Sequence, residues 1–168
     1  DTAAGAAVSA LLDECGFFRG ARAGGLHLGA SFGSSKQWPA ASFAEVASRL
    51  RKHGLWPIVL GSPADAETAA AVSAAAGWAV PSLVARDRPE LLPRLLARLA
   101  CLVSSDTGVA HLAAAVGTPT VTLFGPTDPR LTAPRSRGAR RIEGRAPCAP
   151  CFLPRCPIDH VCMRDITA

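Results

Sequence analysis

The sequence has no tyrosine and no asparagine, and only two of its 18 basic residues are lysines. It also has no apolar run of about 18 residues, so we expect no membrane-spanning helix. Its first residues lack the basic and apolar pattern of a signal peptide, and we therefore expect a cytoplasmic protein. With 168 residues and an apolar fraction of 49%, the chain is expected to form one domain with a buried core.

Acidic residues are scarce in the last part of the chain. Residues 130–168 carry eight arginines against Glu143, Asp159 and Asp165, whereas residues 1–129 carry ten basic and ten acidic side chains. The net charge of +5 therefore belongs entirely to residues 130–168. Such a surface suits an anionic partner, such as nucleic acid or a phosphorylated lipid. A GC-rich genome, which favours Arg and Ala, explains the same composition without any partner.

Apolar segments of strand length alternate with helical segments along the chain. The pattern predicts strands at 26–29, 57–61, 78–80, 101–104, 120–124 and 140–142. It predicts helices at 2–14, from Ser42 to Gly54, at 62–76 and after Asp87, with a loop at 19–25 and a final helix starting at 164–168. Ser42 with Glu45 is typical of a capping box, and Asp87 of an N-cap. This order favours a parallel sheet with right-handed crossovers.

Polar residues follow the strand expected at 101–104. Asp106, Thr107, Gly108 and His111 stand where a strand ends and a short helix begins. The unpaired N–H groups and the positive dipole of a helix start suit phosphate. Thr107 and His111 are four residues apart and share one helix face. A purely structural N-cap would explain Asp106 equally well.

A second loop that suits an anion follows the strand expected at 26–29. It contains Gly29, Ser31 and Lys36, but it matches neither the P-loop nor the dinucleotide fingerprint, and an ordinary loop has the same composition. Carboxyl ends of parallel strands share one edge of a sheet, so the two loops could meet one ligand. Glu67 or Asp65 would lie on this edge and accept hydrogen bonds from ribose hydroxyls. An acidic residue at this position is explained equally well by its interaction with the dipole of the following helix.

Four of the six cysteines lie near the end of the chain, at Cys148, Cys151, Cys156 and Cys162, with His160 among them. The Cys-x2-Cys spacing is typical of metal ligands. The second pair, however, follows the first after fewer residues than in usual zinc sites, and its two cysteines are further apart in sequence. Zinc, a disulfide and free thiols stay open, and stable disulfides are disfavoured without a secretion signal. Elsewhere no Ser-His-Asp set, His-Glu-x-x-His motif or carboxylate pair offers a general base.

The segment from Asp106 to Pro119, followed by residues 123–129, resembles glycosyltransferase family 9, the ADP-heptose:lipopolysaccharide heptosyltransferases. Residues 29–31 with 36–39 look like the first nucleotide-side loop of this family, and residues 162–166 resemble its heptosyltransferase II branch. The likeness runs from about residue 24 to the end of the chain.

This resemblance implies a GT-B enzyme with two Rossmann-like domains, of which the chain is similar to the C-terminal, donor-binding one. The expected fold is α/β: a Rossmann-like parallel sheet flanked by helices, with an irregular Cys-rich tail. We expect residues 1–23 to be a helix and linker from a missing N-terminal domain. Residues 24–145 would then form the nucleotide-sugar-binding domain and residues 146–168 the Cys-rich segment.

The implied reaction is inverting transfer of heptose from ADP-heptose to a hydroxyl of the lipopolysaccharide inner core, with no cofactor or metal required. By matching position, Ser31 and Lys36 would meet the donor phosphates and Glu67 the ribose. Asp106, Thr107, Gly108 and His111 would hold the diphosphate and heptose, and Lys36, Thr107 and Gly108 would stabilise the leaving group. The expected general base, an Asp, lies in the missing domain, so we expect this chain alone to be inactive.

The expected partners are the nucleotide-sugar donor, the lipopolysaccharide acceptor and the missing N-terminal domain, and not nucleic acid. The basic tail would face the anionic acceptor or the cytoplasmic face of the inner membrane. One alternative is a GT-B nucleotide-sugar 2-epimerase, which needs acid/base carboxylates that these loops mostly lack. Another is a zinc-bound basic nucleic-acid module, for which interleaved aromatics and a recognition helix are missing.

Overall fold

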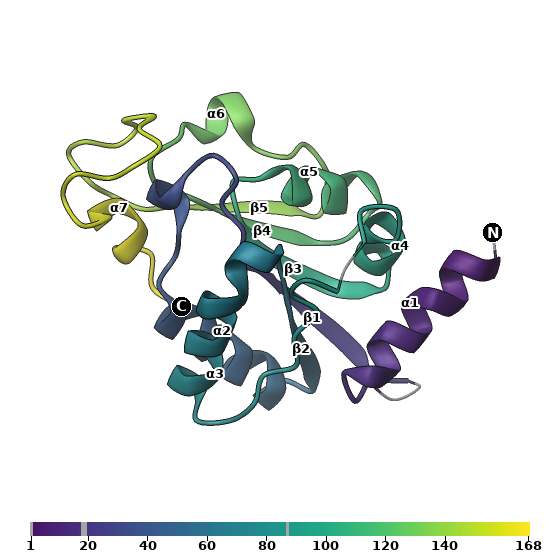
Figure 1. Ribbon diagram of the computed structural model, residues 1–168. Coiled ribbons are helices and arrows are strands. Elements are labelled where there is room, and N and C mark those ends of the chain that lie inside the picture. Colours follow the sequence, from purple (N-terminus) through teal and green to yellow (C-terminus); the bar gives the residue numbers. More distant parts are fainter. Residues whose placement is uncertain (1, 18–19, 87) are drawn as a thin grey trace.

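The computed structural model describes residues 2–17, 20–86 and 88–168. Within these ranges five strands form one parallel sheet in the order β2-β1-β3-β4-β5 (Figure 1). The strands are β1 Arg22–His27, β2 Leu55–Leu60, β3 Leu99–Ser105, β4 Thr120–Phe124 and β5 Ala139–Glu143. This confirms the parallel α/β sheet expected from the alternating pattern and the Rossmann-like fold that the family resemblance implied.

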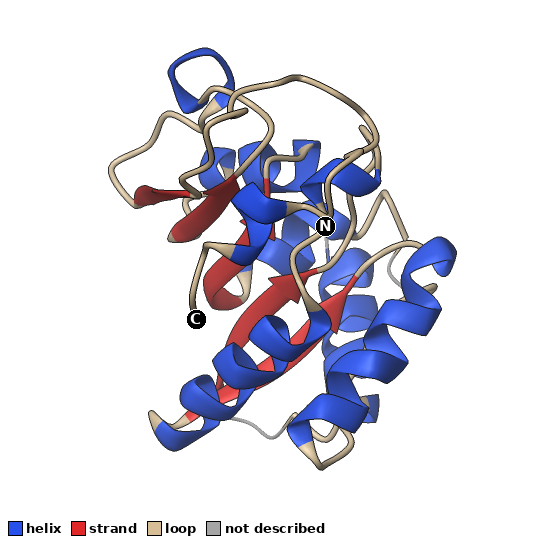
Figure 2. Ribbon diagram, turned by 90° about the vertical axis from the view of Figure 1, so that its left-hand side faces the viewer, coloured by secondary structure: helices blue, strands red, loops and turns tan. Residues whose placement is uncertain are grey.

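Helices cover both faces of the sheet (Figures 1 and 2). Helices α2 (Ala40–Lys52) and α3 (Ala66–Ala76) lie on one face together with the end of the chain. Helices α1 (Thr2–Glu14), α4 (Leu92–Ala97) and α5 (Gly108–Ala115) lie on the other. Along β2, Ile58 and Leu60 pack into one core and Val59 into the other, because successive strand side chains point to opposite faces. Covered on both faces, such strands read as continuous apolar runs.

The loop expected at 19–25 is wrong from Arg22 onward, because β1 begins there. The glycines of this strand explain the error. Gly24 and Gly25 disfavour a strand by propensity. Here they give room to neighbours, since a Cβ on Gly24 would lie 2.8 Å from Leu50 of α2 and one on Gly25 2.6 Å from Leu99. Tertiary packing thus overrides the local preference.

Two expected helix starts are also wrong. Helix α2 begins at Ala40 with Pro39 as its N-cap, so Ser42 lies inside the helix, and Glu45 pairs with Arg49 one turn later at 2.6 Å. Helix α4 begins only at Leu92, and Asp87, its expected N-cap, lies outside the described residues.

The ends of the other elements mostly follow their turn residues. Gly77 ends α3 in the left-handed conformation, with φ of 75°. Residues 78–80 form no strand, although Ser82 bridges to Val59 at the edge of the sheet. The helix expected at 164–168 is wrong, because α7 (Val161–Arg164) ends there and Ile166 turns into the core. In the described part of the chain, every helix is too short or too polar to cross a bilayer.

The Cys-rich tail, residues 146–168, packs back onto the sheet and onto the loop that follows β1. Ser35 N donates to Pro154 O at 3.1 Å, and Trp38 Nε1 donates to Ile166 O at 3.0 Å. The buried Cys162, Met163 and Ile166 join the core over α2. The tail therefore braces residues 33–38, at the carboxyl end of the sheet.

We expect Gly144→Ala to lower the free energy of unfolding by about 1–3 kcal/mol, because a Cβ at this position collides with the main-chain carbonyl of Cys162. Gly5→Ala, on α1, is the control, since no atom lies within 4 Å of the added Cβ and alanine favours the helix. Urea denaturation measures both. Equal stability of Gly144→Ala and the unsubstituted chain would show that the tail is not packed as described.

Candidate functional site

A cavity of ≈ 420 Å³ opens where β1, β2 and β3 end. The strands on either side of β1 are β2 and β3, so the order of strands reverses there, and ligands of open α/β sheets bind at such a switch point. We call it the strand-end cavity. Its lining residues are His27, Gly29, Ala30, Ser31, Gln37, Ser62, Ala64, Asp65, Leu92, Thr107, Gly108, Val109 and Leu112.

The start of α5 forms one wall of the strand-end cavity. Thr107 is the N-cap in an extended conformation, and its side chain makes no capping bond with the helix. The first N–H groups of a helix have no partner within it. Apart from its chain neighbours and the backbone of α5, no atom lies within 4 Å of a Cβ built on Gly108, so the space beside this residue is open. An anion in the cavity can accept hydrogen bonds directly from the helix start.

A buried ion pair joins the two loops that the sequence singled out. Lys36 Nζ lies 2.6 Å from Asp106 Oδ2 and also donates to the main-chain oxygen of Asp106 at 2.9 Å. Thr127 and Thr132 donate to the same carboxylate oxygen at 2.8 and 3.1 Å. Asp106 is therefore not the N-cap of α5, because its carboxylate turns to Lys36 instead.

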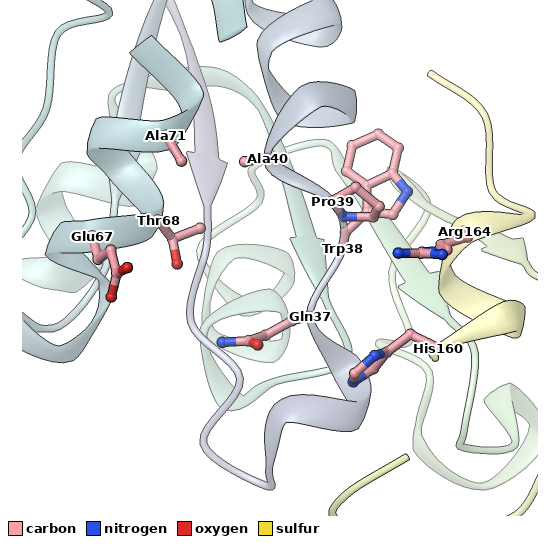
Figure 3. Close-up of a pocket in the computed structure, with 9 residues that line it drawn as sticks. All are labelled: Gln37, Trp38, Pro39, Ala40, Glu67, Thr68, Ala71, His160 and Arg164. Atoms are coloured by element: carbon pink, nitrogen blue, oxygen red, sulfur yellow. The ribbon is translucent and has the colours of Figure 1, made fainter. Parts of the chain in front are cut away.

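Asp65 is committed to its own turn. It is buried, and its Oδ2 accepts from the main-chain N and from Oγ of Ser62, both at 2.8 Å. Glu67 is exposed and lines a neighbouring cavity of ≈ 360 Å³. Figure 3 shows Glu67 on α3 across from His160 and Arg164 of the tail, with Gln37 between them. Gln37 belongs to both cavities, so they adjoin.

The structure thus places the expected site residues at four locations. Ser31, Thr107 and Gly108 line the strand-end cavity, and Glu67 lines its neighbour. Lys36 and Asp106 form the buried pair, with Lys36 Nζ 4.8 Å from the centre of the Phe32 ring. His111 is exposed on α5 and is not among the lining residues of either cavity.

Sequence reasoning missed His27, whose ring lines the strand-end cavity although the residue is only 7% exposed. Burial lowers its pKa to about 4, and the nearby Asp65 carboxylate acts in the opposite direction. His27 is therefore neutral at physiological pH. The available signal was a histidine between Leu26 and Leu28 at the end of a buried strand, two residues before Gly29.

For the four tail cysteines the sequence left zinc, a disulfide and free thiols as open alternatives. Among the described residues, no group of three or more His, Cys, Asp or Glu side chains could hold a metal ion. Cys148, Cys151, Cys156 and Cys162 are free thiols rather than disulfides. Burial raises the pKa of the Cys162 thiol, which packs beside Met163 in the core.

The sequence matches glycosyltransferase family 9 (heptosyltransferase) over residues 12–162. The chain belongs to this family. Lipopolysaccharide heptosyltransferase 1 of Pseudomonas aeruginosa is 37% identical over 124 residues, which cover 73% of this chain and 34% of that protein. Lipopolysaccharide heptosyltransferase 2 of Salmonella typhimurium is 35% identical over 120 residues, covering 68% and 34%. The family 9 chain thus spans about a third of the length of these relatives.

Solved heptosyltransferases share the fold of this family 9 chain. The E. coli ADP-heptose lipopolysaccharide heptosyltransferase II matches with a TM-score of 0.73 and 30% identity, covering 81% of this chain and 42% of that one. The E. coli heptosyltransferase WaaC with ADP matches with a TM-score of 0.62 and 29% identity, covering 74% and 38%. These matches confirm the resemblance carried by residues 106–129 and the GT-B type of fold. They support neither the epimerase nor the nucleic-acid alternative.

We expect the buried pair to behave as a coupled unit. Asp106→Asn leaves the Lys36 ammonium buried without a counter-charge and should cost about 3–5 kcal/mol of unfolding free energy. The double variant with Lys36→Met removes both charges and should cost less than the sum of the single variants. Urea denaturation measures the cycle.

Glu45→Gln is the control for this cycle, because it removes an exposed pair with Arg49 and should change the unfolding free energy by at most about 0.5 kcal/mol. Additive costs in the Lys36 and Asp106 cycle would mean that the pair does not hold the two loops together.

Proposed function

We propose that this chain is the donor-binding half of an inverting heptosyltransferase, which binds ADP-heptose for transfer to the lipopolysaccharide inner core. The observation that carries the proposal is the strand-end cavity with the uncapped start of α5 in its wall, in a chain of family 9. The solved WaaC chains that resemble it were obtained with ADP and with ADP-2-deoxy-2-fluoro heptose. Both structures support a nucleoside diphosphate as the ligand.

In this proposal the diphosphate lies at the start of α5. The N–H groups of Gly108 and Val109 and the hydroxyls of Thr107 and Ser31 would contact its oxygens, since these residues line the cavity. The positive charge of Lys36 stands behind them, but Asp106 offsets much of it at 2.6 Å. We therefore assign more of the leaving-group stabilisation to the helix start than to Lys36.

The rest of the donor is assigned from the surrounding walls. Leu92 and Leu112 give the strand-end cavity apolar walls that suit the faces of a nucleotide base. Glu67 would accept hydrogen bonds from the ribose in the adjoining cavity. His111, one helical turn beyond Thr107 and exposed, would reach the heptose.

The chemistry divides between this chain and the N-terminal domain. Inverting transfer needs a base that deprotonates the acceptor hydroxyl, and groups that stabilise the departing ADP. The strand-end cavity would supply the groups that stabilise the departing ADP, namely main-chain N–H groups and hydroxyls. Asp65 is held by Ser62 and His27 is buried, so we place the base in the N-terminal domain.

Calorimetry with ADP tests the donor site. The chain should bind ADP more tightly than UDP or GDP. Gly108→Leu should lower the affinity for ADP at least about tenfold, because the leucine side chain fills the open space beside the helix start. Gly5→Leu, also in a helix with open space at the Cβ, is the matched control and should bind ADP as the unsubstituted chain does.

Equal ADP affinity of the Gly108→Leu and Gly5→Leu variants would remove the helix start from the donor site. On the reaction itself, the whole protein should transfer heptose from ADP-heptose also in the presence of EDTA, whereas residues 1–168 alone should not. Appreciable transfer by this chain alone would contradict the placement of the base.

We further propose that the basic segment of residues 130–168 contacts an anionic membrane surface near the acceptor. Its arginines are exposed, and so are Phe152, Leu153 and Ile158 of the same segment. Basic and apolar side chains together favour binding at the interface of an anionic bilayer.

Sedimentation with vesicles tests this contact. The chain should bind phosphatidylglycerol-containing vesicles and not pure phosphatidylcholine vesicles, and a fourfold Arg→Gln variant should lose most of this binding. The positions to be changed are Arg135, Arg137, Arg140 and Arg141. A control variant removes the same charge elsewhere, at the exposed Arg49, Arg51, Lys52 and Arg98. Equal losses in both variants would show a general charge effect and refute a contact through the tail.

A further inference from the structure

Three polar side chains connect the interior of the sheet with the strand-end cavity. His27 of β1 and Ser104 of β3 are register partners, and His27 Nδ1 lies 3.3 Å from Ser104 Oγ. Ser104 Oγ lies 3.2 Å from Thr107 Oγ1, the hydroxyl at the start of α5. His27 and Ser104 are buried, whereas Thr107 is half-buried and lines the cavity.

The number of protons fixes how this chain of hydrogen bonds is ordered. Ser104 has a single hydroxyl proton and donates it to the main-chain oxygen of Ser105 at 2.8 Å, which can only accept. Ser104 Oγ must then accept from its two other neighbours. His27 therefore carries its proton on Nδ1, and in the absence of ligand the hydroxyl of Thr107 points to Ser104.

A phosphate oxygen in the cavity changes this order, because it accepts a proton and donates none. The Thr107 hydroxyl would then donate to the phosphate, and Ser104 would turn its own proton from the Ser105 carbonyl to Thr107 Oγ1. The Nδ1–H of His27 continues to donate to Ser104 in both states. Without this donor, the turned hydroxyl would leave a buried lone pair unsatisfied, which is costly.

We propose that His27 is a positioning residue for the donor site: through Ser104, its Nδ1–H orients the Thr107 hydroxyl toward the diphosphate of the nucleotide. This inference rests on the proposed function. His27 never contacts the ligand phosphate in this account, and it acts only through the two hydroxyls.

The surroundings of His27 suit this role. A Cβ on Gly29 would lie 2.8 Å from Cε1 and 3.1 Å from Nε2 of the ring, so only glycine leaves space for the imidazole beneath the loop. Asp65 is the charged group that acts on the ring, and it is held by Ser62. Burial keeps the imidazole neutral, so that it has a single N–H to donate.

The proton position can be measured without any ligand. Long-range proton–nitrogen NMR spectra of the chain should show His27 neutral at pH 5.5, with its proton on Nδ1. A proton on Nε2, or a protonated ring at this pH, would overturn the inference whatever the chain binds.

Two substitutions separate positioning from packing. Asn places an amide N–H near the position of Nδ1, whereas Gln places it near Nε2. His27→Asn should therefore keep the ADP affinity within about twofold, and His27→Gln should weaken it about tenfold, the effect of one hydrogen bond that supports a charged ligand. Ser104→Ala should weaken it to a similar extent, and His27→Gln should add little to Ser104→Ala. The exposed His53→Gln is the control and should bind as the unsubstituted chain does.

The outcomes distinguish the two proposals. An unsubstituted chain that binds no ADP would overturn the proposed function and this inference together. If it binds ADP, and the Asn and Gln variants at position 27 bind it equally well, only the inference fails. Additive losses from His27→Gln and Ser104→Ala would overturn it as well. Thermal unfolding of each variant shows that the compared chains are folded.

Discussion

The ion pair between Lys36 and Asp106 holds the carboxyl edge of the sheet together. These residues are 70 positions apart, and the Asp106 carboxylate also accepts from Thr127 and Thr132, so one oxygen ties together the segments that follow β1, β3 and β4. Taking two charges out of water costs several kcal/mol each, and only close pairing with further hydrogen bonds compensates for it. The interaction is thus better suited to fixing one arrangement of the loops than to adding net stability.

This pairing also determines what the start of α5 can do. An aspartate directly before a helix would ordinarily cap it, but Asp106 is turned to Lys36, and Thr107 makes no capping bond. Gly108 and Val109 at the start of α5 line the strand-end cavity, and no side chain of Thr107 or Asp106 caps the first N–H groups of the helix. Because Asp106 pairs with Lys36 instead of capping α5, the start of the helix is left available to a phosphate. The tail supports this arrangement from outside, since Pro154 accepts from Ser35 in the loop that carries Lys36.

The sequence predicted the parallel sheet, the family and the edge at which the cavity lies, because these depend on alternating segments and on the local motif at 106–129. It did not predict β1 from Arg22, since Gly24 and Gly25 adopt a strand only when α2 and β3 pack against them. Nor could local reasoning show that Lys36 and Asp106 pair, or that His27 meets Ser104, because both contacts join residues at least 70 positions apart. The choice between Glu67 and Asp65 required the fold, in which Ser62 holds the Asp65 carboxylate whereas Glu67 is exposed beside a cavity.

We place the diphosphate of the donor at the start of α5. Amide proton–nitrogen spectra of the chain, recorded during titration with ADP, test this placement most directly. The resonances of Gly108 and Val109 should shift most among the assigned amides, in the direction of stronger hydrogen bonding. Shifts confined to residues 37–40 and 67–71 around the neighbouring cavity, with Gly108 and Val109 unmoved, would contradict it.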